Sequence, residues 1–250
     1  TLQGEGPYAG TPCVFVRLKG CNLNCSFCDT YFDSGDTLTY DQIYDKMCEA
    51  VREFNRTNNI LGSTVRLAVI TGGEPTLQFA NLNPFLEYLH DMGMHTQIES
   101  NGALYREFTP ETHLVCSPKI NEKTGKYIVP KPQMLERINT LKFVVSADPT
   151  SPYNDIPDFA KEWVDGTPEL PWNQRTIYVS PMNMYINEPQ KIGNNGTLEM
   201  RSEVDERISF WTPNLLDPVQ NQANHEHAAF LAMKYGVKLN LQMHLYSSLA

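Results

Sequence analysis

The chain has 250 residues, of which 41% are hydrophobic and 20% are charged, and its formal net charge is -9. This composition is typical of a folded protein, and the negative charge argues against direct binding of nucleic acid or of an anionic membrane. No apolar run approaches the roughly 18 residues that suggest a membrane span, and no segment resembles a secretion signal. We therefore expect a cytoplasmic protein with a single domain over residues 1–250 that acts on a small molecule.

The predicted elements alternate between strands and helices. In chain order they are a strand over Cys13–Gly20, a helix over Tyr40–Phe54, a strand over Val65–Gly73, a helix over Asn81–Gly93, short strands over His95–Gly102, His113–Lys119, Thr140–Ser146 and Arg175–Met182, a helix over Asn224–Gly236 and a last strand over Val237–Leu245. This alternation predicts an α/β fold with a parallel sheet and outer helices, in which ligands gather at the carboxyl ends of the strands. Polar stretches near residues 54–64 and 183–217 interrupt the pattern, and we expect surface loops or insertions there.

Three of the six cysteines crowd into the segment GCNLNCSFCDT, directly after the first predicted strand. Cys21, Cys25 and Cys28 are separated by three and then two residues. A short irregular loop with this spacing lets three thiolates reach three irons of a [4Fe-4S] cluster. The fourth iron then has no local protein ligand, so the amino and carboxylate groups of S-adenosylmethionine (SAM) can chelate it. The competing interpretation is a zinc knuckle, which normally needs four Cys or His ligands, and no nearby residue supplies the fourth.

Three further motifs, TGGEP, ESNG and CSPK, end predicted strands downstream of the cysteines. They offer backbone, carboxylate, hydroxyl, amide and ammonium groups suited to the amino, carboxylate and ribose groups of SAM. Each motif alone is also compatible with ordinary turn chemistry. The candidate SAM-binding residues are Gly72, Gly73, Glu74, Ser100, Asn101, Ser117 and Lys119.

In this order and spacing, the cysteine segment and the strand-end motifs resemble the radical SAM superfamily. The resemblance implies a single-domain, incomplete TIM-type barrel of the radical SAM class. It also implies a [4Fe-4S] cluster and SAM as cofactors, with an external electron donor such as a flavodoxin.

The leading segment from Leu2 to Thr30 resembles the 7-carboxy-7-deazaguanine synthase family more specifically. The SPK motif, the LKFVV run at Leu141–Val145 and the LQMH run near the C-terminal end of the chain extend the resemblance over essentially the whole chain. The sequence departs from the family pattern at Phe27, where Trp is frequent, at Ser100, where Thr is usual, and in the longer stretch at 183–217.

The family resemblance implies a carbon-nitrogen lyase that performs a radical ring contraction. Its substrate, 6-carboxy-5,6,7,8-tetrahydropterin, loses ammonia and becomes 7-carboxy-7-deazaguanine, a precursor of queuosine and other 7-deazapurines, and SAM is regenerated. The resemblance further implies a homodimer and a Mg²⁺ ion at Thr30, directly beyond the last cluster cysteine. One hydroxyl together with waters and substrate oxygens suits Mg²⁺, which keeps part of its hydration shell.

The pterin has an amidine edge that pairs with a carboxylate, and a carboxylate group that pairs with a cation. Residues that match these needs at family-like positions are Gln3, Glu5, Arg17 and His244, and Leu2 beside Gln3 is a further candidate for substrate binding. The alternative interpretations are an exposed loop acid for Glu5, a strand residue reaching water for Arg17, and a structural histidine on the last strand for His244.

Two other functions are compatible with parts of the sequence. A glycyl-radical-enzyme activase shares the QGEG-like start, the cysteine motif and a compact partial barrel, but acts on a protein. A non-catalytic metal-binding protein would hold a cluster or zinc without turnover. The SPK, LKFVV and C-terminal QxH features favour the deazaguanine function over the activase, and iron and sulfide analysis would distinguish a metal-binding protein without turnover.

Overall fold

A computed structural model describes residues 1–25, 32–62, 65–165, 175–184 and 216–247 of the chain. Its strands are β1 (Cys13–Leu18), β2 (Leu67–Gly72), β3 (His95–Ser100), β4 (His113–Cys116), β5 (Ile120–Asn121), β6 (Lys126–Tyr127), β7 (Thr140–Val145), β8 (Thr176–Pro181) and β9 (Lys238–Leu239). Its helices are α1 (Tyr40–Thr57), α2 (Phe79–Asp91), α3 (Pro132–Arg137), α4 (Asp158–Asp165), α5 (Pro218–Tyr235) and α6 (Met243–Ser247), with short 3₁₀ helices η1 (Gly6–Tyr8) and η2 (Pro75–Gln78).

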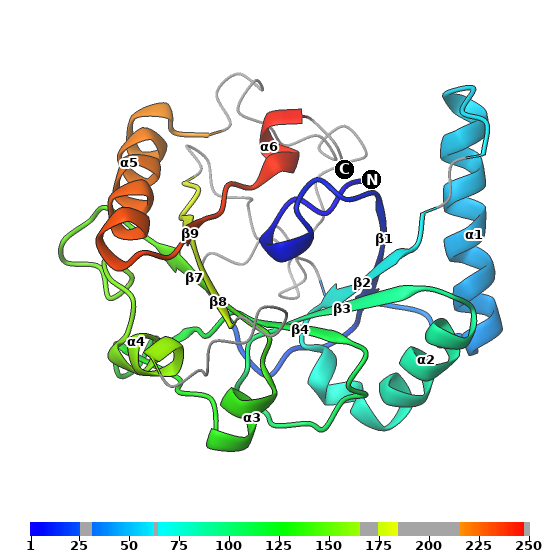
Figure 1. Ribbon diagram of the computed structural model, residues 1–250, viewed down its shortest axis with the longest axis horizontal. Helices are drawn as coiled ribbons and strands as arrows, with labels where there is room; N and C mark the ends of the chain where they lie inside the picture. The colour runs from blue at the N-terminus through cyan, green and yellow to red at the C-terminus, as the bar shows by residue number, and fades with distance from the viewer. Residues whose placement is uncertain (26–31, 63–64, 166–174, 185–215, 248–250) are drawn as a thin grey trace, which may run out of the picture.

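Seven of the described strands form one sheet in the order β1-β2-β3-β4-β7-β8-β9. Every neighbouring pair in this sheet is parallel, whereas β5 and β6 form a small antiparallel hairpin. Within the described residues, β1 and β9 are the two edges, so the sheet stays open (Figure 1). The α/β class and the parallel sheet predicted from the alternating pattern are thereby confirmed.

The main hydrophobic core lies between the sheet and the helices packed on its outer face. Alternate strand residues such as Ile70 and Phe143 point into this core, where Leu86 of α2 meets them. On the opposite, inner face of the sheet, Leu67 and Val69 form a smaller cluster with Cys13. The N-terminal segment with η1 and the C-terminal α6 lie side by side over this inner face (Figure 1), joined where the Met243 N–H donates to the Gly4 carbonyl at 3.1 Å. The inner face is therefore enclosed by the two ends of the described chain.

Capping side chains set the starts of the long helices. Thr39 and Gln42 form a reciprocal capping box at the start of α1, as the predicted helix from Tyr40 requires, and α1 continues beyond Phe54 into the stretch expected to be a loop. Asp217 caps α5 by accepting the backbone N–H groups of Val219 and Gln220. The helix therefore begins well before the predicted start at Asn224.

The last strand is much shorter than the alternation over Val237–Leu245 predicts. Only Lys238–Leu239 pairs with β8, and His244 lies in α6 rather than on a strand. Asn240 still donates its backbone N–H to the Val179 carbonyl at 2.8 Å, while its side chain accepts the Gly6 N–H at 2.8 Å and donates to Ser180 Oγ at 2.8 Å. Polar residues in this run turn the chain toward the N-terminal segment, so the strand prediction is wrong beyond Leu239.

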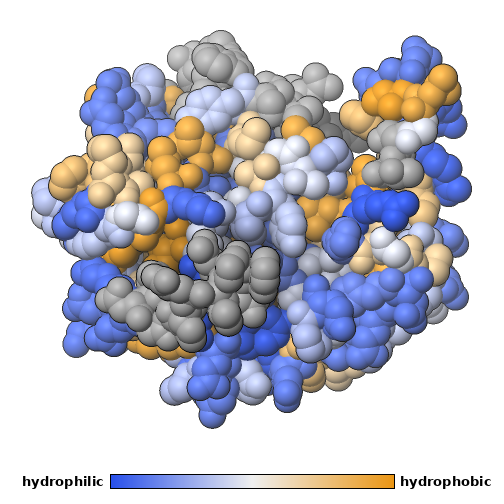
Figure 2. All heavy atoms as spheres, in the orientation of Figure 1, coloured by the Kyte–Doolittle hydropathy of each residue, from blue (hydrophilic) through white to orange (hydrophobic). Residues whose placement is uncertain are grey.

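The surface carries an apolar region over α5. Figure 2 shows hydrophilic side chains over α2 and hydrophobic ones gathering over α5, where Val219, Phe230 and Met233 are exposed. A search of the described helices finds none that combines the length and the apolar character needed to cross a membrane.

His113, at the start of β4, is a partly buried histidine on the inner face of the sheet, and its burial makes stability depend on pH. Its Nε2 lies 3.0 Å from Thr140 Oγ1, and its ring packs edge-on against Tyr8 with 5.3 Å between ring centroids. Burial, helped by the charge of Arg137, lowers the pKa of His113 from 6.5 to about 4. Between pH 4 and pH 6.5 the unfolded chain binds more protons than the folded protein. The contribution of His113 to the free energy of unfolding is therefore fully present above pH 6.5 and is lost as the pH falls toward 4.

We expect protonation of His113 to lower the free energy of unfolding by roughly 2–3 kcal/mol as the pH falls from 6.5 to 4. Chemical denaturation at half-unit pH steps should show a shallower decline for His113→Gln than for the unmodified protein. Parallel pH profiles for the two proteins would contradict the burial of a neutral imidazole.

Candidate active site

Four motif-bearing segments meet at one edge of the sheet because their strands are parallel neighbours. β1 leads to the cysteine segment, β2 ends in the GGE motif, and β3 and β4 end in ESNG and CSPK. The carboxyl ends of adjacent parallel strands lie together (Figure 1), so groups far apart in the sequence face one site.

The segment that carries the first cysteine is fastened to the end of β2. The Gly20 carbonyl accepts the Glu74 N–H at 2.7 Å, and the Lys19 carbonyl accepts Gln78 Nε2 at 2.8 Å. Cys21 follows directly and is half-buried, with the Leu23 N–H pointing at its sulfur over 3.4 Å. These bonds fix the position of Cys21 at the start of the cysteine loop.

Cys25 is also half-buried on this loop, whereas Cys28 and Thr30 lie outside the described residues. Thiols on an irregular loop beside strand ends are the donors that an iron-sulfur cluster requires. Within the described part of the chain, no group of three or more His, Cys, Asp or Glu side chains is arranged to hold a metal ion. Two of the three predicted thiols are therefore placed at the site, and the positions of Cys28 and Thr30 stay predictions.

The glycines of the GGE motif allow two backbone segments to touch. A Cβ on Gly72 would lie 2.2 Å from the backbone nitrogen of Leu18, and its φ of +115° favours glycine. A Cβ on Gly73 would lie 1.9 Å from the Gly20 carbonyl oxygen. The motif thus brings the end of β2 directly against the entry to the cysteine loop.

The acceptor positions of the Glu74 carboxylate are occupied by hydrogen bonds within the protein. Its Oε1 accepts the N–H and the hydroxyl of Thr76 at 3.0 and 2.7 Å and the Ser100 hydroxyl at 2.8 Å, and its Oε2 accepts the Asn101 N–H at 2.7 Å. The residue is only 1% exposed. Glu74 therefore ties the end of β2 to the end of β3.

The other predicted SAM-binding residues lie in a connected set. Asn101 Nδ2 donates to Asn22 Oδ1 at 2.8 Å, which links β3 to the cysteine loop. Lys119 Nζ donates to Ser117 Oγ at 2.7 Å, and the Ser117 N–H donates to the Ser100 carbonyl at 2.8 Å. Strand ends and cysteine loop thus form a single hydrogen-bonded unit.

A second group of polar side chains lies on the inner face of the sheet, and we call it the inner polar cluster. Its members are Gln3, Glu5, Gln97, Glu99, Lys142 and Gln242. The Lys142 ammonium bridges the carboxylates of Glu5 and Glu99, at 3.0 Å from Glu99 Oε2. Its side chain is 9% exposed, against 18% and 15% for the two carboxylates, so the ion pairs are largely screened from water.

Opposing effects of burial and charge set the protonation of this cluster. Burial acts to raise the pKa of Glu5, but the Lys142 ammonium and hydrogen bonds from Lys142 and Gln242 outweigh it and lower the pKa to about 2. Burial raises the pKa of Glu99, with Lys142 opposing the shift and Glu5 adding to it. Burial acts to lower the pKa of Lys142, but both carboxylates outweigh it and raise that pKa.

The predicted substrate-binding residues are only partly brought together. Gln3 and Glu5 belong to the inner polar cluster, and Leu2 lies beside them in a bridge with Pro12. A Cβ on Gly4 would lie 2.6 Å from His244 Nδ1, so His244 is next to the same segment.

Arg17 is the exception among the predicted substrate-binding residues. It is exposed on edge strand β1, with its guanidinium 5.1 Å from the centroid of the Phe15 ring. No contact between Arg17 and the inner polar cluster is found among the described residues.

Sequence reasoning missed Glu99, Lys142 and Gln242. A signal for Lys142 was present, because a lysine inside the otherwise apolar run LKFVV must be buried with a charged partner if the run is an internal strand. Glu99 occupies the matching kind of position in β3, between Ile98 and Ser100.

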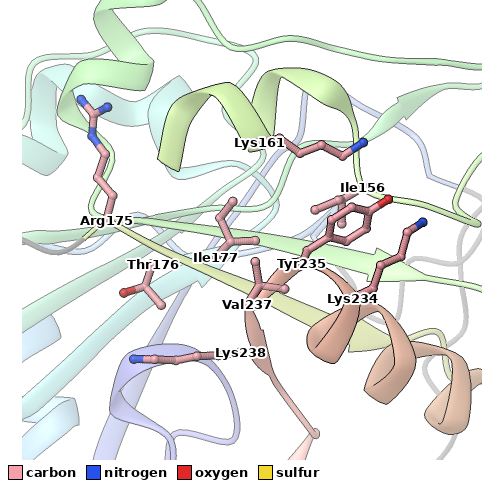
Figure 3. Close-up of a pocket in the computed structure, with 10 residues that line it drawn as sticks. Ile156, Lys161, Arg175, Thr176, Ile177, Lys234, Tyr235, Val237 and Lys238 are labelled. Atoms are coloured by element: carbon pink, nitrogen blue, oxygen red, sulfur yellow. The ribbon is translucent and has the colours of Figure 1, made fainter. Parts of the chain in front are cut away.

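A separate pocket of about 450 Å³ lies around the start of β8 and the end of α5, away from the strand ends that carry the motifs. Lys161 and Lys234 line it, but each is already paired, with Asp158 and Asp155 respectively. Figure 3 shows Arg175 and Lys238 pointing away from these two lysines. Its polar groups do not converge on one ligand position, so the candidate active site is the edge that holds the cysteine loop.

Comparison with known proteins agrees with this geometry. A family model described as the radical SAM superfamily matches residues 15–113. The chain is 33% identical over 246 residues to 7-carboxy-7-deazaguanine synthase of Rickettsia prowazekii, covering 98% of this chain and 84% of the relative. It is 36% identical over 167 residues to the synthase of Rhodospirillum rubrum, covering 63% of this chain and 60% of that relative.

A solved structure supports the fold. The crystal structure of QueE from Escherichia coli matches with a TM-score of 0.61 and 22% sequence identity, covering 97% of this chain and 90% of that one. The long match to the Rickettsia relative is the stronger observation, because it includes both the cysteine segment and the C-terminal residues that close the inner face. The chain therefore belongs to the 7-carboxy-7-deazaguanine synthase family of the radical SAM superfamily.

Proposed function

We propose that this protein converts 6-carboxy-5,6,7,8-tetrahydropterin into 7-carboxy-7-deazaguanine, with loss of ammonia. The observation that carries the proposal is the placement of a charged inner polar cluster on the same sheet whose strand ends hold the cysteine loop. A radical-generating loop alone would serve many reactions. The enclosed carboxylates add the hydrogen-bond acceptors that a pterin ring requires.

In this proposal the thiolates of Cys21, Cys25 and Cys28 hold a [4Fe-4S] cluster. Cluster and SAM, when bound, supply the radical that starts the ring contraction. Because the Glu74 carboxylate already accepts four hydrogen bonds, backbone groups of Gly72 and Gly73 are left to receive the amino group of SAM.

The remaining cofactor residues act through groups that can still bond. Asn101, Ser117 and Lys119 hold the carboxylate and ribose of SAM, which their amide, hydroxyl and ammonium groups suit. Ser100 already donates its hydroxyl proton to Glu74 and can accept a bond from a ribose hydroxyl.

Substrate binding is assigned to the N-terminal segment and its neighbours. Glu5 receives the amidine edge of the pterin, with Leu2, Gln3 and His244 beside the ring. Arg17, at the edge of the sheet, pairs with the substrate carboxylate. The task of these residues is to position the ring and to exclude water, since no acid-base triad is needed.

Four further features complete the proposal. Thr30 holds a Mg²⁺ ion through its hydroxyl, and an external donor such as a flavodoxin supplies electrons. The exposed apolar side chains of α5 are consistent with the expected homodimer, which a molar mass from light scattering would test. We also expect the protein to act in the cytoplasm.

Incubation of anaerobically reconstituted protein with the carboxypterin, SAM, Mg²⁺ and a reductant tests the function. We expect 7-carboxy-7-deazaguanine and ammonia in equal amounts, with SAM not consumed in proportion to product. Cleavage of SAM to 5′-deoxyadenosine with no deazaguanine formed would overturn the assignment and favour another radical SAM reaction.

A further inference from the structure

Lys142 is the central cation of the inner polar cluster, although no part of the proposed reaction yet uses it. It lies on β7, where neighbouring Leu141 and Phe143 point into the hydrophobic core. Its own side chain points to the inner face and contacts Glu5 and Glu99, which come from segments 137 and 43 positions away. One ammonium thus joins the N-terminal segment to the middle of the sheet.

Glu99 has little capacity left for a ligand. An ionised carboxylate offers about four lone-pair positions. In Glu99, Oε1 accepts Gln97 Nε2 at 2.6 Å and Gln3 Nε2 at 3.4 Å, and Oε2 accepts Lys142 at 3.0 Å. Three of its positions are therefore taken by groups of the protein.

Glu5 is bonded differently, and it keeps capacity on both of its oxygens. Its Oε2 accepts Lys142 and its Oε1 accepts Gln242 Nε2, which leaves about one lone-pair position on each oxygen. A planar amidine presents two parallel N–H donors and needs this arrangement of two acceptors. Among the two carboxylates, Glu5 is the one prepared for such an edge.

Lys142 also balances charge in a space that water barely reaches. Without its ammonium, two buried carboxylates would face each other, and such groups repel unless one takes up a proton or moves into water. The Glu5 side chain lies outside the sheet and is the more exposed of the two, at 18% against 15%, so it is the carboxylate expected to turn toward water. Loss of Lys142 would therefore displace or neutralise the acceptor for the pterin.

We propose that Lys142 is a positioning residue for substrate binding, which holds Glu5 ionised and aligned by bridging it to Glu99. The inference rests on the proposed function, because it takes the pterin as the ligand of Glu5. Lys142 acts through Glu5 on the amidine edge and does not contact the substrate carboxylate.

Equilibrium dialysis under anaerobic conditions tests this role with two probes, 6-carboxytetrahydropterin and tetrahydropterin, which lacks the carboxylate. We expect Lys142→Met to raise the Kd of both probes by a similar factor of about ten or more. Lys142→Arg should keep most of the affinity, because a guanidinium can span the same two carboxylates. The matched control is Lys123→Met, an exposed lysine in the β5–β6 hairpin, which should change neither Kd.

A double variant separates charge balance from direct contact. Lys142→Met with Glu99→Gln removes the facing negative charge, and we expect it to bind both pterins at least about three-fold more tightly than Lys142→Met alone. Loss of affinity for the carboxylated probe only would show that Lys142 contacts the substrate, and would overturn the positioning role. An equal loss of SAM affinity in Lys142→Met would overturn it as well, because the change would then be a general disturbance of the site.

The same data distinguish failure of this inference from failure of the proposed function. If the unmodified protein binds neither pterin and forms no deazaguanine, the function and the inference both fall. If it binds the carboxypterin and forms product while Lys142→Met binds both probes normally, only the role of Lys142 is overturned.

Discussion

Replacing Gly73 with alanine is expected to remove most of the cluster-dependent activity. The new Cβ would lie 1.9 Å from the Gly20 carbonyl oxygen and 2.4 Å from its carbonyl carbon, and both are backbone atoms that cannot rotate away. The segment leading into Cys21 must then move by about an ångström, and a displacement of that size can cost roughly 100-fold in rate. Iron content and turnover of the anaerobically reconstituted variant measure the effect.

Gly93→Ala is the matched control for this substitution. Gly93 has a positive φ, of +76°, which Gly73 does not have, but a Cβ at Gly93 would meet nothing within 4 Å. We expect it to lose only about 1 kcal/mol of stability from backbone strain and to keep its iron and turnover. Full iron content and normal turnover in Gly73→Ala would show that the GGE motif does not brace the cysteine loop.

Glu74→Gln is expected to have the second largest effect. An amide replaces one acceptor oxygen by an NH₂ group, which must face either the Asn101 N–H or the donors from Thr76 and Ser100. Leaving such buried donors unpaired costs about 2–4 kcal/mol. In a chain of this length that lowers Tm by roughly 4–16 °C. SAM affinity should fall as well, because the ends of β2 and β3 separate.

Thermal unfolding and calorimetric titration with SAM measure the two effects, with Glu107→Gln as control. Glu107 is exposed, so its substitution should alter neither Tm nor SAM affinity. A Glu74→Gln variant with normal Tm but weak SAM binding would instead place the carboxylate on the cofactor, contrary to its four internal bonds.

The fold was predictable because its signals are local. The apolar run ended by glycines marked β2, and its near-continuous hydrophobicity reflects burial on both faces of a parallel sheet. The last strand was mispredicted because alternation between polar and apolar residues does not identify the hydrogen-bond partners of the polar side chains. Asn240 bonds to Gly6 and Ser180, and no pattern within Val237–Leu245 announces those partners.

The site was predictable where spacing carries the chemistry. Cys21 and Cys25 are close in sequence, and the strand-end motifs follow from parallel neighbours meeting at one edge. The inner polar cluster is different, because Lys142, Glu5 and Glu99 come from three distant segments. A single buried lysine predicts that partners exist, but only the packed structure identifies them.

The bond between Gln242 and Glu5 spans 237 positions, and this separation orders events during synthesis. The cysteine loop and the first strand ends are synthesised early and bond to one another, whereas Glu5 must wait for 237 further residues before Gln242 is made. A nascent chain can therefore form the hydrogen-bonded strand ends around the cysteine loop before the inner polar cluster is complete. We expect a chain arrested before Gln242 to carry Cys21 and Cys25 but to lack the bond that holds the Glu5 carboxylate from the C-terminal side.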